Sequence, residues 1–151
     1  MASAPDDREV TVREFSLEDY DGVVGLWTAA GLSFRPNGRD RRDRVAAELE
    51  RGVAVFLVAE SAGRLVGTVL GTHDGRKGWI NRLAVAPDCR RRGIGRLLVE
   101  EVEARLEALG PEITAALVET TNEASLRFFR AIGYEHDPTM EYVSRRRSPD
   151  T

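Results

Sequence analysis

The stretch RRRGIG, Arg90 to Gly95, stands between the apolar segment LAVAP (83–87) and the segment RLLVEEVEARL (96–106). The apolar segment ends at a proline, which is typical of a strand and its end. The second segment belongs to an amphipathic helix, whose apolar residues share one face: Ile94, Leu97, Leu98, Val102, Leu106 and Leu109. Backbone N–H groups in a glycine turn at a helix N-terminus bind anions, because the helix dipole adds positive potential there. The stretch therefore predicts an anion cradle.

The residues around the two glycines exclude two other phosphate-binding loops. A loop of the Walker type ends in Gly-Lys-Ser or Gly-Lys-Thr, and the chain contains neither. A dinucleotide-binding turn has a third glycine where this chain has Leu98, and an acid about twenty residues later, where this chain has Ala115. The remaining pattern is Arg/Gln-x-x-Gly-x-Gly.

The composition is that of one globular domain. The chain has 151 residues, of which 42% are hydrophobic and 31% charged, and its net charge is −3. This acidic balance argues against a broadly basic nucleic-acid binder. Basic residues gather at 39–44, 90–96 and 145–147, and we interpret the first and third groups as solvated charged faces.

The first residues and the cysteine content favour a cytoplasmic protein. Residues 1–10 lack the apolar stretch of a signal peptide, and no run is long enough to span a bilayer. The single cysteine, Cys89, allows no intrachain disulfide. We expect one domain at 8–145, flexible termini at 1–7 and 146–151, and no membrane partner.

The pattern along the chain predicts an α/β protein. A first strand at 9–15 is followed by Ser16 and Asp19, which form a capping box before a helix that ends at Gly31. The further elements expected are a helix at 39–52, a meander of three strands at 53–60, 64–73 and 79–86, a helix after the cradle to Gly110, a strand at 113–120, a helix at 122–132 and a last strand at 139–145. The expected order is β-α-α-β-β-β-α-β-α-β, one mixed sheet with helices on its faces.

Three longer segments carry a resemblance to a known family. The segments INRLAVAPDCRRRGIGRLLVEEVEARLEALG (80–110) and LVETTNEASLRFFRAIGY (117–134) resemble both central motifs of the GCN5-related N-acetyltransferase (GNAT) superfamily. The segment VFLVAESAGRLVGTVLGTHDGRKGW (55–79) resembles the hairpin that leads into them. The resemblance covers about residues 10–145. It implies a single-domain GNAT fold, with six to seven strands and four helices, that moves an acetyl group from acetyl-CoA to a primary amine by direct attack in a ternary complex.

The resemblance also implies where coenzyme A lies. Its pyrophosphate would sit in the cradle, its pantetheine arm along the strand before the cradle, and the far side of the arm against the last helix. The residues implied are Leu83, Ala84, Val85, Arg90, Arg91, Arg92, Gly93, Ile94, Gly95, Arg96, Asn122, Ser125 and Phe129. Two alternatives stay open: Asn122 also suits a plain helix N-cap, and core packing also explains the pair Phe128 and Phe129.

The catalytic assignment departs from the family pattern. A lysine-like amine has a pKa of about 10.4, so removing its proton near neutral pH costs about 4 kcal/mol, and a general base helps. Trp79 and Asn81 stand where some relatives carry a base, so Glu119 is the candidate base; a surface carboxylate paired with an arginine is the alternative. Many relatives carry a tyrosine, the presumed acid, where this chain has Phe129. The hydroxyls nearby in the sequence belong to Tyr134 and Tyr142.

The resemblance places the amine acceptor against the first two helices, the loop between them and the last hairpin. The residues that this implies are Trp27, Phe34, Arg35 and Asn81, with Asn122 beside the reacting centre. An apolar loop with one arginine favours an amine that carries a carboxylate, such as an amino acid or a peptide end. We expect a small-molecule or peptide acceptor, no metal, no nucleic acid, and a monomer or homodimer. A catalytically silent acetyl-CoA sensor is the alternative that Phe129 favours.

Overall fold

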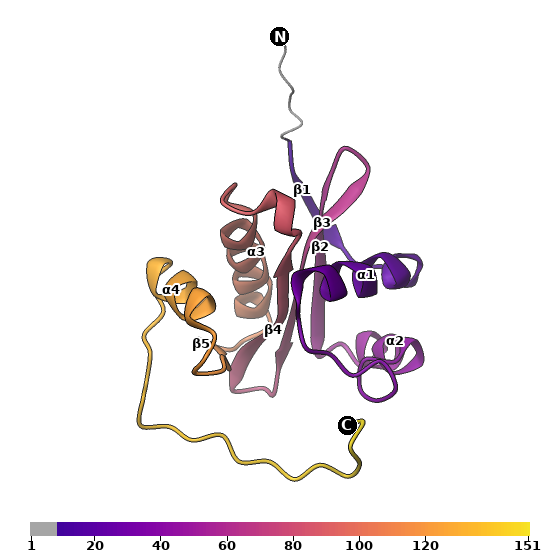
Figure 1. Cartoon of the computed structure of the whole chain (residues 1–151). Helices are drawn as coiled ribbons and strands as arrows, with labels where there is room; N and C mark the ends of the chain where they lie inside the picture. The colour runs from indigo at the N-terminus through magenta and orange to yellow at the C-terminus, as the bar shows by residue number, and fades with distance from the viewer. Residues whose placement is uncertain (1–8) are drawn as a thin grey trace.

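The computed structural model describes residues 9–151; residues 1–8, which include the predicted flexible segment 1–7, lie outside the described residues. Within 9–151, five strands form one sheet in the order β1-β2-β3-β4-β5 (Figure 1). The strands are β1 (Thr11–Glu14), β2 (Ala54–Ser61), β3 (Arg64–His73), β4 (Lys77–Val85) and β5 (Ile113–Ala116). The α-helices are α1 (Tyr20–Ala30), α2 (Arg42–Glu50), α3 (Ile94–Ala108) and α4 (Glu123–Ala131). Two short 3-10 turns are η1 (Leu17–Asp19) and η2 (Pro87–Cys89).

Helices cover both faces of this sheet. In Figure 1, α1 and α2 lie on one side, and α3 and α4 lie on the other. Strands β1 to β4 pair antiparallel, and β5 joins β4 in parallel. One buried cluster lies mainly under α3 and includes Leu98 and Val102, and a second lies under α1 and α2 and includes Trp27 and Phe56. The predicted α/β class and the three-strand meander are confirmed.

Helix α3 lies directly on the backbone of β3 because glycines face it. A Cβ on Gly67 would meet Leu98 at 2.8 Å, and a Cβ on Gly71 would meet Val102 at 2.6 Å. Alternate residues of a strand face opposite sides, so Thr68 and Leu70 face α1, whereas Val69 faces α3 like the two glycines. Accordingly, the hydroxyl of Thr68 accepts a hydrogen bond from the indole N–H of Trp27 in α1. The close approach fixes the height of α3 above the sheet.

The last predicted strand, at 139–145, is wrong. These residues have no regular structure, and Met140, Tyr142 and Val143 are exposed. Figure 1 shows the segment running from α4 past the end of the sheet toward the loop before α2. A strand needs a partner to complete its ladder, and β5, at the edge of the sheet, has only four residues. The expectation of six to seven strands is corrected to five within residues 9–151, and the observed order lacks the final strand.

One further boundary differs from the prediction, that of the strand before the last helix. The strand predicted at 113–120 ends at Ala116, and residues 117–119 continue without regular structure. The terminal segment 146–151 closes in a turn in which the N–H of Thr151 donates to the carbonyl of Ser148 at 3.2 Å. Its flexibility stays a prediction.

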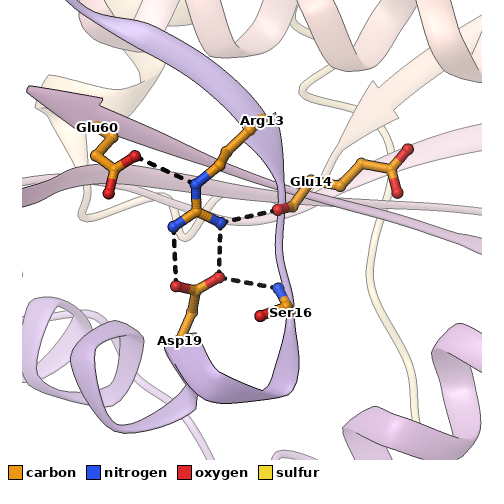
Figure 2. A network of polar contacts seen from close by, with 5 residues as sticks. All are labelled: Arg13, Glu14, Ser16, Asp19 and Glu60. Carbon is orange, nitrogen blue, oxygen red and sulfur yellow. Dashed lines mark hydrogen bonds and ion pairs between the residues drawn. The ribbon is translucent and has the colours of Figure 1, made fainter. Parts of the chain in front are cut away.

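An arginine fixes the first strand to the start of α1 (Figure 2). The guanidinium of Arg13 donates to both carboxylate oxygens of Asp19, at 2.8 and 2.9 Å, and to Glu60 of β2 at 3.3 Å. Asp19 also accepts the N–H of Ser16 at 2.9 Å, which is part of the predicted capping box. The hydrogen bonds from Arg13 hold the pKa of Asp19 below its ordinary value.

This pair makes stability depend on pH. A carboxyl whose pKa is depressed by folding stabilises the fold above its ordinary pKa, here 3.8, and that contribution is lost as the pH falls through the depressed value. Asp19→Asn should therefore lower the free energy of unfolding by about 1 kcal/mol at neutral pH, and the difference from the wild type should shrink below pH 3.8. Urea unfolding over a pH series measures this, with the exposed neighbour Glu18→Gln as control. A deficit that does not change with pH would contradict the expectation.

Candidate functional site

The turn before α3 has the backbone of an anion cradle. The N-cap of α3 is Gly93, whose φ is +80°, and Arg91 also has a positive φ, +65°. Glycine has no side chain to cap the helix, and the first turn contains no acidic residue. The first N–H groups of an α-helix have no partner within the helix. They therefore add to the helix dipole at this end of α3, as the sequence predicts.

The chain leading into the cradle is fixed to the sheet. The N–H of Ala86 donates to the carbonyl of Val66 at 2.8 Å. In η2, the carboxylate of Asp88 accepts two hydrogen bonds from Arg64 of β3, at 2.9 and 2.7 Å, and Cys89 is buried. These contacts set where the cradle begins relative to β3 and β4.

The arginines of the cradle lie at its surface. Arg90, Arg91 and Arg92 are exposed, and Arg92 has further contacts within the chain. Arg96 is directed along the helix instead, where its Nε donates to Glu100 at 3.0 Å. The positive charge at the start of α3 therefore comes mainly from 90–92.

Gly95 makes room for a phenyl ring. A Cβ on Gly95 would meet the ring of Phe128 at 3.2 Å and the side chain of Val85 at 3.8 Å. The missing side chain therefore allows α4 to pack against the start of α3. The contact of the Gly95 N–H with an anion stays a prediction.

The residues predicted on α4 divide between a cap and the core. The side chain of Asn122 accepts the N–H of Ser125 at 3.1 Å, so the N-cap alternative is confirmed. Asn122 is exposed and Ser125 is half-buried. Phe129 is only 8% exposed and packs edge-on against Phe128 and Tyr134. Phe129 therefore lies where the packing alternative places it, and its contact with coenzyme A stays a prediction.

Strands β4 and β5 separate beside the cradle. Their ladder begins at Lys77 with Ile113 and ends at Ile80 with Ala116, whereas β4 continues to Val85. Within the described residues, the edge of β4 from Asn81 onward therefore has no strand partner on the side of β5. Backbone N–H and C=O groups on such an edge pair with an added extended chain.

A bulge interrupts β4 beyond the end of its ladder with β5, where β4 still pairs with β3. Thr68 pairs with Ala84 and Leu70 pairs with Asn81, so two residues of β4, Arg82 and Leu83, stand opposite one residue of β3. Arg82 has φ +52°, in the left-handed region. The hydroxyl of Thr68 donates to the carbonyl of Arg82 at 3.0 Å and fixes this conformation.

A buried ion pair joins the bulge to the loop between α1 and α2. Arg82 donates to both oxygens of Asp40, at 2.7 and 3.2 Å, and the two side chains are 13% and 6% exposed. Asp40 also accepts the N–H of Arg35 at 2.6 Å, and its carbonyl accepts the hydroxyl of Tyr20 at 2.7 Å. The sequence does not predict this pair, because the alternating charges at 39–44 favour a solvated helix face. Helix α2 begins only at Arg42, so Asp40 lies in the loop and is buried.

The residues predicted for the acceptor lie on the same side of the sheet. Trp27 is 1% exposed, and its Nε1 donates to Thr68 at 3.0 Å, so its ring belongs to the core and not to an open wall. Phe34 is half-buried, with its ring 5.4 Å from that of Trp27. Within the described residues, the buried Nε of Arg35 has no hydrogen-bond partner. The side chain of Asn81 donates to Thr72 at 3.3 Å.

The candidate acid and base residues have different surroundings. Glu119 is exposed, and within residues 9–151 it forms no ion pair, so the paired-carboxylate alternative is not what the structure has. Tyr134 donates its hydroxyl to Glu103 of α3, and burial together with this hydrogen bond raises the pKa of Tyr134. Tyr142 is exposed in the irregular terminal segment. Tyr134 is thus engaged elsewhere, and Glu119 lies three residues past the end of β5, where its role as a base stays a prediction.

Within 9–151, no group of three or more His, Cys, Asp or Glu side chains is arranged to hold a metal ion. None of the helices in the same range is long and apolar enough to cross a bilayer.

Residues 23–134 match the family model described as the acetyltransferase (GNAT) family. Among solved structures, the PaiA N-acetyltransferase from Thermoplasma acidophilum, in complex with coenzyme A, aligns with a TM-score of 0.72 at 20% identity, over 87% of this chain and 93% of that one. AAC(6')-Iy in complex with a bisubstrate analogue aligns with a TM-score of 0.74 at 16% identity, over 91% of this chain and 99% of that one. Glucosamine-6-phosphate N-acetyltransferase from Arabidopsis thaliana aligns with a TM-score of 0.71 at 16% identity, over 93% of this chain and 99% of that one. These structural alignments show a shared fold.

The contact between α3 and α4 can be tested with a double-mutant cycle. Gly95→Ala should be less stable than Gly25→Ala by about 1 kcal/mol, because its new Cβ would lie 3.2 Å from the ring of Phe128, tighter than ordinary contact, and the ring must shift. In a Phe128→Leu background the same substitution should cost less, since the ring is gone. Gly25→Ala is the matched control, because no atom lies within 4 Å of its added Cβ. Equal costs in both backgrounds would contradict the assignment.

Proposed function

This chain belongs to the acetyltransferase (GNAT) family, and from that premise we propose that it transfers an acetyl group from acetyl-CoA to a primary amine. One observation carries the proposal: the unpaired edge of β4 runs directly into the cradle at the start of α3. The edge offers hydrogen bonds to an extended amide chain, and the cradle offers charge and N–H groups to an anion. Coenzyme A joins these two groups, a pantetheine amide chain and a pyrophosphate, in one molecule.

The donor would lie across both features. The pyrophosphate would be held by N–H groups at Gly93 to Arg96 and by the side chains at 90–92, and the pantetheine arm would extend β4 along Leu83 to Val85. The PaiA N-acetyltransferase, which shares the fold, was solved with coenzyme A, and this supports the assignment. The thioester would then lie near the bulge at Arg82.

The proposed reaction is a direct acetyl transfer. The amine nitrogen forms a bond to the acetyl carbon, the carbon–sulfur bond breaks, and the sulfur leaves as a thiolate. Glu119, acting through water, would take the proton that the amine loses. A backbone N–H of the bulged strand would stabilise the oxyanion. Ordinary thiols ionise near pH 8.5, so the thiolate leaves readily without an acid at Phe129.

The proposed binding of acetyl-CoA is testable at the cradle. Acetyl-CoA should raise the melting temperature, whereas NAD and ATP should raise it less, because neither supplies a pantetheine arm for β4. The double variant Arg90→Ala with Arg91→Ala should weaken acetyl-CoA binding about 5–20-fold by calorimetry, through lost charge-assisted contacts. Arg44→Ala, an exposed arginine of α2, is the control. An unchanged Kd in the double variant, or tighter binding of NAD or ATP, would overturn the donor site.

For the acceptor, we propose an amine that carries a carboxylate, either a small molecule or a peptide end. The supporting observation is a gathering of arginines beside the bulge. Arg35 has a buried Nε without a partner among the described residues. Burial and the positive charge of Arg82 lower the pKa of Arg39; Asp40 opposes this shift, and Arg146 and Arg35 add to it. An anion brought to this group offsets the mutual repulsion of its guanidinium groups.

The acceptor class is decided by an assay of thiol release. Amino acids and short peptides should be acetylated with a kcat/KM at least about tenfold above that of matched amines without a carboxylate. Arg35→Gln should raise the KM of the carboxylate-bearing amines about tenfold and leave the others unchanged. Arg44→Gln is the control. Polyamines or aminoglycosides that react as well as amino acids would refute the carboxylate proposal but not the transferase. Thermal stabilisation by acetyl-CoA with no thiol release from any amine would indicate the silent sensor instead.

A further inference from the structure

The bulge of β4 is held from two directions by side chains outside the cradle. The hydroxyl of Thr68 binds the carbonyl of Arg82 at 3.0 Å, and the same hydroxyl accepts the indole N–H of Trp27 at 3.0 Å. The guanidinium of Arg82 is bound by Asp40 through two hydrogen bonds and lies 5.8 Å from the centre of the Trp27 ring. Both the main chain and the side chain of Arg82 are therefore fixed.

This arrangement is costly unless the geometry serves a purpose. A residue with a β-carbon is disfavoured in the left-handed region, and burying two charges carries a desolvation cost that their attraction must offset. An apolar residue at position 82 would avoid the cost of burying a charge. The ion pair instead provides a defined orientation of the bulged peptide.

The orientation matters because of the geometry of the peptide bond. The described residues contain no cis peptide bond, so the N–H of Leu83 points opposite to the carbonyl of Arg82. That carbonyl is directed to Thr68 of β3. The N–H of Leu83 is therefore directed away from β3, toward the edge of β4 that β5 leaves unpaired.

The other end of the ion pair reaches the loop between α1 and α2. Asp40 binds the main-chain N–H of Arg35 at 2.6 Å and, through its carbonyl, the hydroxyl of Tyr20. Phe34 and Arg35, the proposed acceptor residues, are therefore held by the same carboxylate that holds the bulge. One buried pair connects the donor strand with the acceptor loop.

We propose that the Asp40–Arg82 pair positions the N–H of Leu83 against the acceptor loop, so that both substrates meet in register at the thioester. Asp40 and Arg82 act as positioning residues and touch neither the acetyl group nor the cradle. The inference rests on the proposed acetyl transfer. It predicts that breaking the pair slows the transfer step while acetyl-CoA still binds normally.

The test compares kcat with the Kd of acetyl-CoA in three variants. Asp40→Asn should lower kcat about 10–100-fold and change the Kd less than about threefold, because the cradle is intact. Arg82→Lys keeps the charge but loses the two-pronged contact, so its kcat should fall less. Thr68→Val removes the hydroxyl that holds the bulge and should lower kcat with the ion pair intact. The Thr68→Val variant therefore still tests the effect of the bulge on kcat if Asp40→Asn does not fold.

Asp19→Asn is the matched control, since it breaks a two-pronged arginine–carboxylate pair remote from the bulge. It should reduce stability and leave kcat unchanged. A wild-type kcat in folded Asp40→Asn or Thr68→Val would overturn the inference, and so would a loss of acetyl-CoA affinity as large as the loss of kcat. A wild-type protein that transfers no acetyl group to any amine would refute the proposed function instead, so the two failures are distinguishable.

Discussion

The hydrogen-bond ladder between β4 and β5 stops at the pair formed by Ile80 and Ala116, and the candidate site depends on this point. Before it, the sheet is continuous, and its two faces are covered by helices. After it, β4 stays paired with β3 but has no strand on its other side within the described residues, and it leads into η2 and the N-terminus of α3. An edge inside a protein is normally paired or covered. Here it is left open next to a concentration of positive potential, which suits a ligand that has both an extended amide chain and an anion.

The charged groups around this edge follow two different physical rules. At the cradle, Arg90 and Arg91 are exposed, so water screens them until an anion arrives. At the bulge, Arg82 is buried and its charge is already balanced by Asp40. The first group is suited to binding and release. The second is suited to holding one geometry, because any movement would separate two charges in a medium of low polarity.

Local patterns predicted most of the fold. The limits of β3 agree with those predicted at 64–73, and the cradle at 90–95 does precede a helix, since hydrophobic periodicity and glycine turns act over few residues. The failures concern contacts between distant residues. Asp40 was placed on a solvated helix because its partner lies 42 positions away. The segment 139–145 has the alternation of a strand, but alternation supplies no neighbour to pair with.

The glycines beneath α3 have a consequence for how the site is built. Gly67 and Gly71 let the helix rest on main-chain atoms of β3, whose dimensions do not depend on sequence. The level of the cradle above the sheet is therefore set by backbone geometry, several residues away from the arginines that give it charge. Placement and charge are thus encoded separately. Substitutions at 90–92 can change the affinity of the cradle for an anion without shifting the N-terminus of α3.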